Sequence, residues 1–581
     1  MKIRTSLVLL LLSGNLLLSG TETERDSARI EQPVAPAGTY SIADQILESS
    51  NYVFLPYDDW GVKGVFQLFG LPATALQLTS GGLPLNDPVY GQVPLSWLNP
   101  RFDKITLGST AVTITPRYFR TDKVFSRFDY YRGDYGYLNF SMVLCGTLPD
   151  STTVWRFVGE NLGYDGYYGM IGPDRRKTGE SVSQIFRLDF SSRLKYWQID
   201  LNSAYRKYLP GYTQAVPSSI TTYLLPSSEG NVKEYQASIG VSATQATERD
   251  STTLGLQQAN YVYGQFADDP DFGFKGVADQ TDLKIYREQR FGRWRIHLAL
   301  EPMTRAVTLR NGFYLRQNLF SWLMGFTRPL KKTSLGFNLG AHNRNFTGDM
   351  YYFYDLTRRD KIGVRFTNNY ALYPLVYKLN FKANQKLSTD GFTYRLRTLD
   401  LQHNGRNIQL DLAINQVNSD FFMPYKSTID DTMITYSRQK LDAIYLSTNG
   451  KLNLPWRMSL TARSLLSNNS DGLWVQGWGQ IRQELDLFKK NLRLYVAGEI
   501  TYWDTAARLA WFEELRGTGN VGVDYYTNNR LNLVGRVGGN IGDFHLFYVI
   551  YNVEGRAFST ISGMTSRNRI KIFGVEWQFL D

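Results

Sequence analysis

Hydrophobic and polar residues alternate one by one through most of the chain beyond about residue 124. Phe186 and Leu188, for example, alternate with Arg187 and Asp189. The same period of two recurs at 197–202, 377–384, 408–415 and 492–500. A period of two places successive side chains on opposite faces of a β-strand. The pattern therefore predicts many antiparallel strands, each with one apolar face and one mostly polar face.

Alternation alone leaves open whether the apolar face meets a second sheet or the lipid of a membrane. The composition favours lipid, because 14% of the residues are aromatic, including 38 Tyr and 12 Trp. Tyr and Trp are enriched at both interfaces of membrane proteins. The low mean hydropathy of −0.31 is compatible with a transmembrane barrel, since only every second strand residue faces lipid. A helical membrane protein is excluded, because no later run approaches the roughly 18 apolar residues of a spanning helix.

A sheet in hydrocarbon has to close on itself, because unpaired backbone groups are costly there. Residues 122–581 allow roughly 18 to 22 strands at about 10 residues per strand plus turns, and the turn signals favour about 22. The predicted fold class is all-β, a large antiparallel transmembrane β-barrel. Such a barrel is too wide for its own side chains to fill, so it needs a plug or becomes a pore. Residues 42–121 would supply a small N-terminal α+β plug domain.

The start of the chain has the layout of a secretory signal peptide. Lys2 and Arg4 carry positive charge, and residues 7–18 are largely apolar. No cysteine lies near the expected cleavage point, which argues against a lipoprotein anchor. We therefore expect residues 1–20 to be cleaved after export. Residues 21–41 are polar and then rich in Pro and Ala, which predicts a flexible periplasmic linker.

A short segment near residue 85 is rich in turn-forming residues. Glycine permits positive φ, Asn and Asp bond their own backbone, and Pro fixes φ. These properties predict two tight turns in a compact, rigid loop, and a structural role for each residue. The residues concerned are Gly82, Pro84, Leu85, Asn86, Asp87, Pro88 and Gly91.

This segment resembles the plug motif of TonB-dependent outer-membrane receptors, which has the form D-G-x-P-L-N-D-P and precedes a large barrel. Each of the seven residues just named matches the motif, and Gly81 replaces the usual acidic residue. The resemblance implies a helix near 43–47, a strand near 75–79 and another near 102–107. After these, residues 108–113 depart from the family's usual turn. We therefore expect the plug to fit its barrel differently, or to fill it less fully.

The resemblance also implies a TonB-like periplasmic protein as an energising partner. In that family a short extended segment before the plug pairs with this partner by strand addition. The candidate residues are Ile30, Glu31, Gln32 and Val34. Pro33 lies among them and would interrupt the hydrogen-bonding ladder.

The last strand resembles the C-terminal strand that outer-membrane barrels have in common. Gly574, Trp577 and Phe579 match its glycine and aromatic spacing, and Leu580 and Asp581 extend beyond it. The resemblance implies the barrel-insertion machinery as a partner. The apolar members of this strand should face lipid and the others the lumen.

The sequence shows no catalytic or cofactor pattern. Four histidines lie far apart without ligand spacing, and no nucleotide-binding fingerprint appears in the required context. We therefore expect no enzyme activity, no cofactor and no metal site. Cys145 is the only cysteine, so it cannot form an internal disulfide and should be a buried apolar residue.

The net charge of +11 could indicate nucleic acid, but in an exported barrel it favours basic lumen and loop residues that attract anions. Basic clusters such as 293–295 and 331–332 are expected at the lumen or at the periplasmic ends of strands. No nucleic acid partner is expected.

The predicted function is plug-gated uptake of a scarce small-molecule solute across the outer membrane of a Gram-negative-type bacterium, with outer-membrane lipid around the barrel. Two alternatives remain open, a passive porin-like channel with a reduced plug and a surface barrel that transports nothing. An energised receptor should lose uptake when residues 21–40 are deleted. A porin should conduct ions as an isolated protein, and a surface barrel should do neither.

Overall fold

The structure is a computed structural model that describes most residues between 52 and 580. The longest stretches outside the described residues are 1–51, 57–63, 165–180, 210–231, 266–275, 380–389, 522–529 and 557–568. The predicted signal peptide, linker and helix near 43–47 therefore lie outside the described residues. The same holds for Ile30, Glu31, Gln32, Val34 and Gly82.

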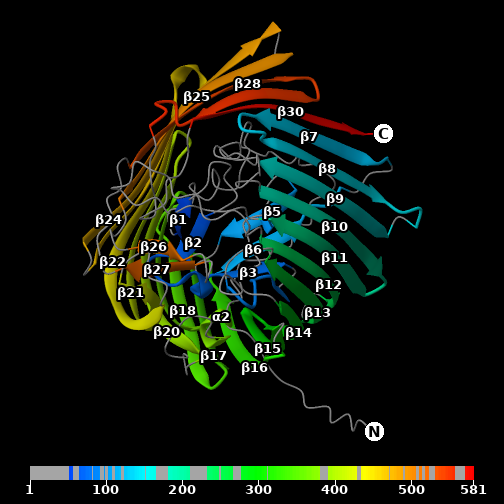
Figure 1. Cartoon of the computed structure of the whole chain (residues 1–581), viewed down its shortest axis with the longest axis vertical. Helices are drawn as coiled ribbons and strands as arrows, with labels where there is room; N and C mark the ends of the chain where they lie inside the picture. Colours follow the sequence, from blue (N-terminus) through cyan, green and yellow to red (C-terminus); the bar gives the residue numbers. More distant parts are fainter. Residues whose placement is uncertain are drawn as a thin grey trace.

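Twenty-two antiparallel strands form a closed barrel (Figure 1). The first eleven are β7 (Phe125–Gly133), β8 (Leu138–Thr147), β9 (Thr153–Tyr164), β10 (Ser181–Leu194), β11 (Trp197–Leu209), β12 (Val232–Ala246), β13 (Asp250–Gln265), β14 (Gly276–Phe291), β15 (Trp294–Leu309), β16 (Tyr314–Pro329) and β17 (Thr333–His342). The other eleven are β18 (Asn345–Asp355), β19 (Asp360–Leu372), β20 (Gly391–Asn404), β21 (Ile408–Lys426), β22 (Thr435–Leu454), β23 (Met458–Asn469), β24 (Gly472–Leu487), β25 (Leu492–Asp504), β28 (Leu531–Ile541), β29 (Phe544–Tyr551) and β30 (Ile570–Leu580). The last strand pairs with the first, Phe579 opposite Ser126, so the predicted fold class is confirmed.

A small hairpin leaves the barrel wall between β25 and β28. These two strands pair directly with each other, and the chain between them forms β26 (Leu509–Phe512) and β27 (Gly517–Val521). Strand β27 runs parallel to the end of β21, with Tyr425 opposite Asn520. Figure 1 shows the hairpin inside the ring of strands.

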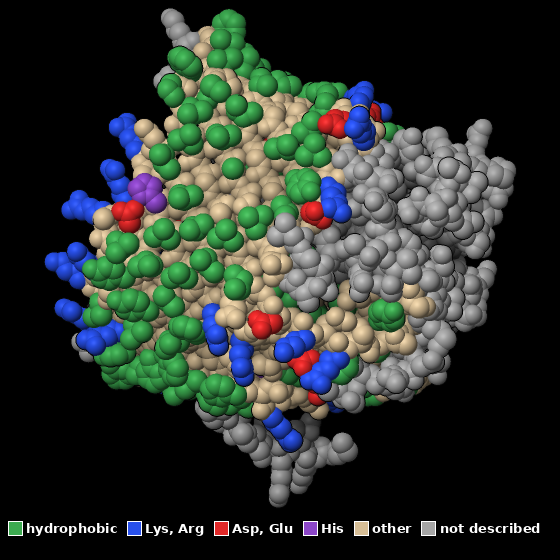
Figure 2. Space-filling model, turned by 90° about the vertical axis from the view of Figure 1, so that its left-hand side faces the viewer, with side chains coloured by type: hydrophobic (Ala, Val, Ile, Leu, Met, Phe, Trp, Pro, Cys, Tyr) green, Lys and Arg blue, Asp and Glu red, His purple; other side chains and the backbone are tan. Residues whose placement is uncertain are grey.

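Apolar side chains cover the outside of the barrel, and polar ones point inward. On β10, Phe186 and Leu188 are 43% and 39% exposed, whereas Arg187 and Asp189 between them are buried. Figure 2 shows hydrophobic side chains spread over the outer wall. The alternation predicted from the sequence is confirmed here, because the polar face is the one packed inside. No helix among the described residues is long and apolar enough to cross a membrane.

The connections between strands differ in length at the two ends of the barrel. At one end only short turns occur, such as 195–196 between β10 and β11 and 292–293 between β14 and β15. We call this end the short-turn rim. All the long connections lie at the opposite end, which we call the long-loop end, and β30 finishes at the short-turn rim. In membrane barrels the short turns face the periplasm and the long loops face outward.

A small mixed domain lies inside the barrel (Figure 1). Its main sheet has the order β4-β3-β6-β5, and a separate pair of strands and a 3-10 turn accompany it. These elements are β1 (Tyr52–Pro56), β2 (Gly64–Leu68), η1 (Ala73–Ala75), β3 (Gln77–Ser80), β4 (Leu83–Pro84), β5 (Asp103–Leu107) and β6 (Ala111–Pro116). Buried apolar residues of this domain and of the barrel wall form one continuous core. We call the domain the plug.

One strand expected from the alternation is wrong. The pattern over 377–384 predicts a strand, but the described part, 377–379, belongs to the short helix α2 (Val376–Leu379). Pro374 precedes this helix, and the backbone of 375–376 bonds to the plug rather than to a neighbouring strand. A run of four alternating apolar residues is too short to distinguish a wall strand from a segment buried inside the barrel.

The exposed apolar wall can be tested by placing a charge on it. Leu256, near the middle of β13, is 47% exposed on the outer face. We expect Leu256→Arg to lower the free energy of unfolding in lipid vesicles by about 2–4 kcal/mol, because the charge enters hydrocarbon. Urea titration of the vesicle-inserted protein measures this value.

The matched control is Leu148→Arg, the same change at a residue that is 38% exposed in the short turn between β8 and β9. It should change the free energy of unfolding little. If Leu256→Arg is as stable as this control, the outer wall does not face hydrocarbon.

Candidate functional site

Asn86 holds together the loop that follows β4. Its Oδ1 atom accepts a hydrogen bond from the backbone N–H of Leu78 at 2.7 Å. Its Nδ2 atom donates to the carbonyl oxygens of Leu76 and Gly91, at 3.0 and 3.3 Å. A single side-chain amide therefore ties both ends of the loop to strand β3 and to the turn before it.

Asp87 organises the next turn and joins the plug to the barrel. Its Oδ1 atom accepts hydrogen bonds from the backbone N–H groups of Val89 and Tyr90, at 2.8 and 2.9 Å. The same atom accepts one from the hydroxyl of Tyr263 on β13, at 2.8 Å. Burial raises the pKa of Asp87 above its ordinary value, although these donors and Arg206 favour the charged form.

Gly91 closes the loop at a position where a side chain does not fit. Its φ angle is +69°, and its N–H donates to the carbonyl oxygen of Asp87 at 2.7 Å. A Cβ atom here would lie 2.2 Å from Cγ2 of Thr74 and 3.2 Å from Cγ of Pro374. The glycine is therefore needed both for the backbone conformation and for close packing.

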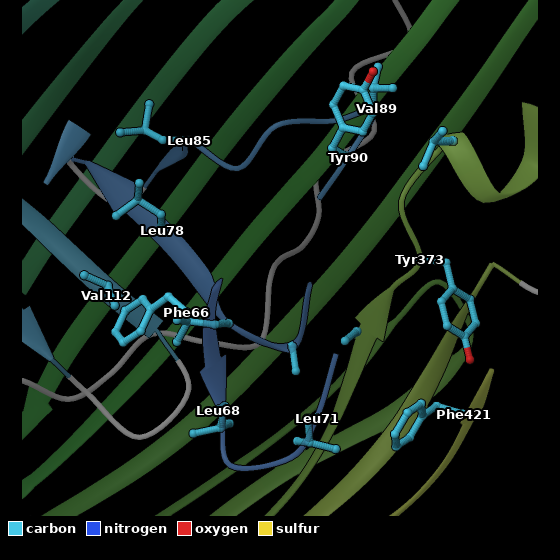
Figure 3. Packing of buried hydrophobic residues seen from close by; sticks show 14 of the residues in the cluster. Phe66, Leu68, Leu71, Leu78, Leu85, Val89, Tyr90, Val112, Tyr373 and Phe421 are labelled. Carbon is cyan, nitrogen blue, oxygen red and sulfur yellow. The ribbon is translucent and has the colours of Figure 1, made fainter. Parts of the chain in front are cut away.

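Residues 373–379, which we call the cover segment, reach in from the long-loop end and lie on this loop. The N–H of Val376 donates to the carbonyl oxygen of Val89 at 2.9 Å, and the N–H of Leu375 donates to that of Pro88 at 3.4 Å. Figure 3 shows Val89 of the plug and Tyr373 of the cover segment within the same hydrophobic cluster. The plug is thus in direct backbone contact with a segment from the long-loop end.

The barrel wall holds the cover segment in place through Tyr373. Its carbonyl oxygen accepts a hydrogen bond from Arg305 of β15 at 3.1 Å. Its hydroxyl oxygen accepts one from the backbone N–H of Phe422 on β21 at 2.6 Å. Aromatic rings of the wall and of the cover segment pack against one another here, with the centroids of neighbouring rings 5.0 to 5.9 Å apart. The rings belong to Tyr373, Tyr377, Phe392, Phe421 and Tyr436.

The β26–β27 hairpin makes a second contact from the long-loop end. Nε2 of Gln67, on plug strand β2, donates to Oγ1 of Thr518 on β27 at 3.1 Å, and both side chains are buried. Lys426 of β21 lies with its Nζ atom 5.1 Å from the ring of Phe512 on β26. The hairpin is therefore fixed both to the wall and to the plug.

A buried ion cluster holds the other side of the plug near the short-turn rim. Asp103, the first residue of β5, pairs with Arg156 of β9 at 2.9 Å and with Arg187 of β10 at 2.7 Å. Arg156 also pairs with Asp189 at 2.6 Å and donates to the carbonyl oxygen of Phe102 at 2.6 Å. The four charged groups are two acids and two bases, all buried. We call them the Asp103 cluster.

The residues singled out in the sequence fall into two separate places. Asn86, Asp87, Pro88 and Gly91 meet in the plug loop just described, next to Pro84 and the buried Leu85. Gly574, Trp577 and Phe579 lie on β30 in the wall, where the Trp577 and Phe579 rings are 4.5 Å apart. Cys145 is buried, as expected, and its Sγ accepts a hydrogen bond from the N–H of Phe119.

The sequence pattern does not predict which residues of the barrel contact the plug. The alternation identifies Arg187 and Asp189 as inward-facing members of β10, but nothing in the pattern pairs them with Asp103. The same alternation predicts a wall strand where the chain forms the end of the cover segment. Among the described residues, no group of three or more His, Cys, Asp or Glu side chains is placed to hold a metal ion.

Comparison with known proteins gives a clear structural likeness. No protein-family model matches the chain, and no curated protein sequence matches it. The siderophore receptor PirA from Acinetobacter baumannii aligns over 93% of this chain and 96% of its own, with a TM-score of 0.68 and 10% identity. A mutant of the ferric enterobactin receptor PfeA from Pseudomonas aeruginosa aligns over the same shares, with a TM-score of 0.71 and 11% identity. The ferric yersiniabactin uptake receptor FyuA from Yersinia pestis aligns over 94% and 96%, with a TM-score of 0.69 and 10% identity.

The chain has the fold of these receptors. The likeness spans the plug and the barrel together, since almost the whole length of each chain aligns. The fold expected from the plug motif is therefore confirmed. At these sequence identities the comparison establishes the fold, and the solute has to be argued separately.

The Asp103 cluster should control how firmly the plug is seated. Asp103→Ala leaves Arg187 without this acid and Arg156 with only Asp189. Removing one partner from a buried ion pair costs about 3–5 kcal/mol. We therefore expect the variant to open an ion-conducting path at a lower urea concentration than the unaltered protein, measured as single-channel conductance in planar bilayers.

Asp200→Ala is the matched control, because Asp200 on β11 bonds Gln198 of the same strand. This variant should open at the same urea concentration as the unaltered protein. Equal behaviour of the two variants would contradict the assigned role of the Asp103 cluster.

The raised pKa of Asp87 predicts a pH dependence of plug seating. A carboxyl with a raised folded-state pKa stabilises fully below its unfolded-state pKa, and this contribution is lost as pH rises through the folded-state pKa. Asp87→Asn keeps the Oδ1 acceptor and removes the charge. We expect the variant to need more urea to open than the unaltered protein at neutral pH.

This difference should shrink as the pH falls toward the ordinary range of an Asp carboxyl, because the unaltered side chain is then protonated. The same conductance measurement at several pH values follows it. Earlier opening of Asp87→Asn at neutral pH would show that Arg206 and the hydrogen-bond donors outweigh burial.

Proposed function

We propose that the protein is an outer-membrane receptor that imports a scarce solute, with the plug as the gate. The observation that carries this proposal is the seating of the plug inside the barrel by separate contacts at its two ends. The Asp103 cluster holds it near the short-turn rim, and the cover segment bonds to its loop near the long-loop end. A barrel filled in this way passes a solute only if the plug moves.

The location in an outer membrane is supported by the apolar outer wall and by the likeness to receptors of that membrane. The exposed Phe186 and Leu188 belong to a band of large apolar side chains that recurs around the barrel. A soluble protein rarely exposes so large a contiguous apolar surface. Export through a cleaved signal peptide at 1–20 and insertion guided by Gly574, Trp577 and Phe579 belong to the same proposal.

The solute is proposed to be a ferric chelate of the siderophore class. The similar structures are named as receptors for siderophores, ferric enterobactin and ferric yersiniabactin. The net charge of +11 favours attraction of an anionic solute. The segment from the long-loop end that touches the plug gives a physical route, because a solute that displaces it breaks the bonds of Val376 and Leu375 to the plug loop.

Energy for opening is proposed to come from a TonB-like periplasmic protein. A solute that displaces the cover segment at the long-loop end leaves the buried Asp103 cluster at the other end of the plug intact, and loss of one partner of that cluster costs about 3–5 kcal/mol. A periplasmic protein could pair with the extended segment that holds Ile30, Glu31, Gln32 and Val34 and pull on the plug. This mode of binding uses backbone hydrogen bonds more than side chains.

Uptake by living cells tests the energised gate. The chain and a version lacking residues 21–41 are expressed in cells without other receptors, and import of ferric enterobactin and ferric yersiniabactin is measured. We expect the full chain to import at least one of the two chelates and the deletion to abolish import. Surface binding of that chelate should remain in the deletion, because the barrel and the cover segment are intact.

A version in which residues 21–41 are replaced by a Gly/Ser linker of equal length serves as the control for chain length. It should also fail to import. If either altered chain imports as fast as the full chain, passage needs no pull on this segment, and the passive porin-like alternative takes precedence.

A further inference from the structure

The short-turn rim carries basic side chains at the tips of several turns. Between β10 and β11 the turn exposes Lys195, and between β14 and β15 it exposes Arg293. The next turns expose Lys331 with Lys332, and Arg358 with Arg359. Figure 2 shows Lys and Arg side chains standing along one edge of the wall, beside the hydrophobic surface.

Acidic residues do not balance this charge in the sector from β14 to β17. The stretches 290–295 and 328–333 contain three basic residues each and no acidic residue. In the next turn, between β18 and β19, Arg358 and Arg359 are accompanied by Asp355 and Asp360, and Asp360 bonds Thr357 and His403. Further along the rim, Asp486 pairs with Arg457 and Arg493. The short-turn rim therefore presents a positive sector rather than a mixture of charges.

Exposed aromatic rings stand beside the basic side chains. Tyr196 is 63% exposed, and the Nζ atom of Lys195 lies 5.2 Å from its ring. The Cζ atom of Arg328 lies 4.8 Å from the centroid of the Trp294 ring. Trp456 is 84% exposed and precedes Arg457. Aromatic rings with a polar edge and long cationic side chains are the combination that settles at the boundary between lipid tails and headgroups.

We propose that the sector of the short-turn rim from β14 to β19 binds anionic phospholipid headgroups of the periplasmic leaflet. Guanidinium and ammonium groups donate charge-assisted hydrogen bonds to phosphate oxygens. Exposed apolar residues such as Leu335 and Phe337 on β17 begin just beyond the Lys331 turn. They give the acyl chains of the same lipid a surface to lie on, which a free phosphate ion would not use.

The inference rests on the proposed function only in taking the barrel to lie in a membrane with its short turns in the periplasm. It adds a binding partner that gating by the plug does not require. Lipid held at this rim would fix the height and tilt of the barrel, because the headgroup phosphates stay in the plane of the membrane surface.

The test uses the full chain inserted in vesicles of phosphatidylethanolamine with a minority of phosphatidylglycerol. The protein is extracted with its bound lipid, and the two lipids are quantified by mass spectrometry. We expect phosphatidylglycerol to be enriched over its share in the vesicle. The quadruple variant Lys331→Gln, Lys332→Gln, Arg358→Gln and Arg359→Gln should lower this enrichment on the order of fivefold or more, and added salt should do the same.

Two matched variants separate charge at this rim from other effects. Lys331→Arg, Lys332→Arg, Arg358→Lys and Arg359→Lys keep every charge and should keep the enrichment. Arg316→Gln, Arg395→Gln, Arg397→Gln and Lys440→Gln remove the same charge from exposed positions in the half of the wall nearer the long-loop end, and should also keep it. A heat-shift on electrophoresis confirms that each barrel is folded, and Arg293→Gln with Lys332→Gln replaces the quadruple variant if that one does not fold.

No enrichment in the unaltered protein, or an equal loss in the long-loop-end variant, would overturn the proposal. The proposal would also be overturned if another protein, and not lipid, were extracted bound to the rim. Failure of the proposed function is distinguishable, since a chain that imports no chelate can still enrich phosphatidylglycerol, and one that loses lipid binding can still import.

Discussion

The whole structure depends on one constraint, that a sheet surrounded by hydrocarbon can have no unpaired edge. Closure is achieved when β30 pairs with β7, and every wall strand then has two neighbours. A cylinder of twenty-two strands is too wide for its own side chains to fill. The same constraint that gives the barrel its stability therefore creates the need for a separate domain inside it.

The plug meets that need with two kinds of contact at its two ends. Near the short-turn rim the contact is a buried set of charges around Asp103, which is strong when complete and costly when one partner leaves. Near the long-loop end the plug is held by neutral backbone hydrogen bonds to the cover segment, which a shift of that segment can break. Side-chain bonds from Tyr263 to Asp87 and from Gln67 to Thr518 add to them. The two ends thus differ in how they can be released. This difference suits the proposed gate, in which a solute displaces the cover segment at the outer end and a periplasmic protein pulls on the plug from the other side.

Much of the architecture follows from the sequence, because a period of two is a property of every wall strand. The alternation places Phe186 and Arg187 on opposite faces of their strand, and the composition favours the apolar face as the outer one. The turn chemistry of the loop around Asn86 likewise predicts a rigid structure. The partners of the plug cannot be predicted in this way, since Asp103 meets Arg156 only after the chain has closed around it. The cover segment escapes prediction for the same reason, because its alternation is that of a wall strand while its bonds go to the plug.

The measurement that tests the central claim most directly is single-channel conductance in planar bilayers, comparing the full chain with a version lacking residues 42–121. We predict that the full chain stays closed and that the deletion gives a large, steady pore. A full chain that conducts steadily by itself would contradict it, because the plug would then not close the barrel.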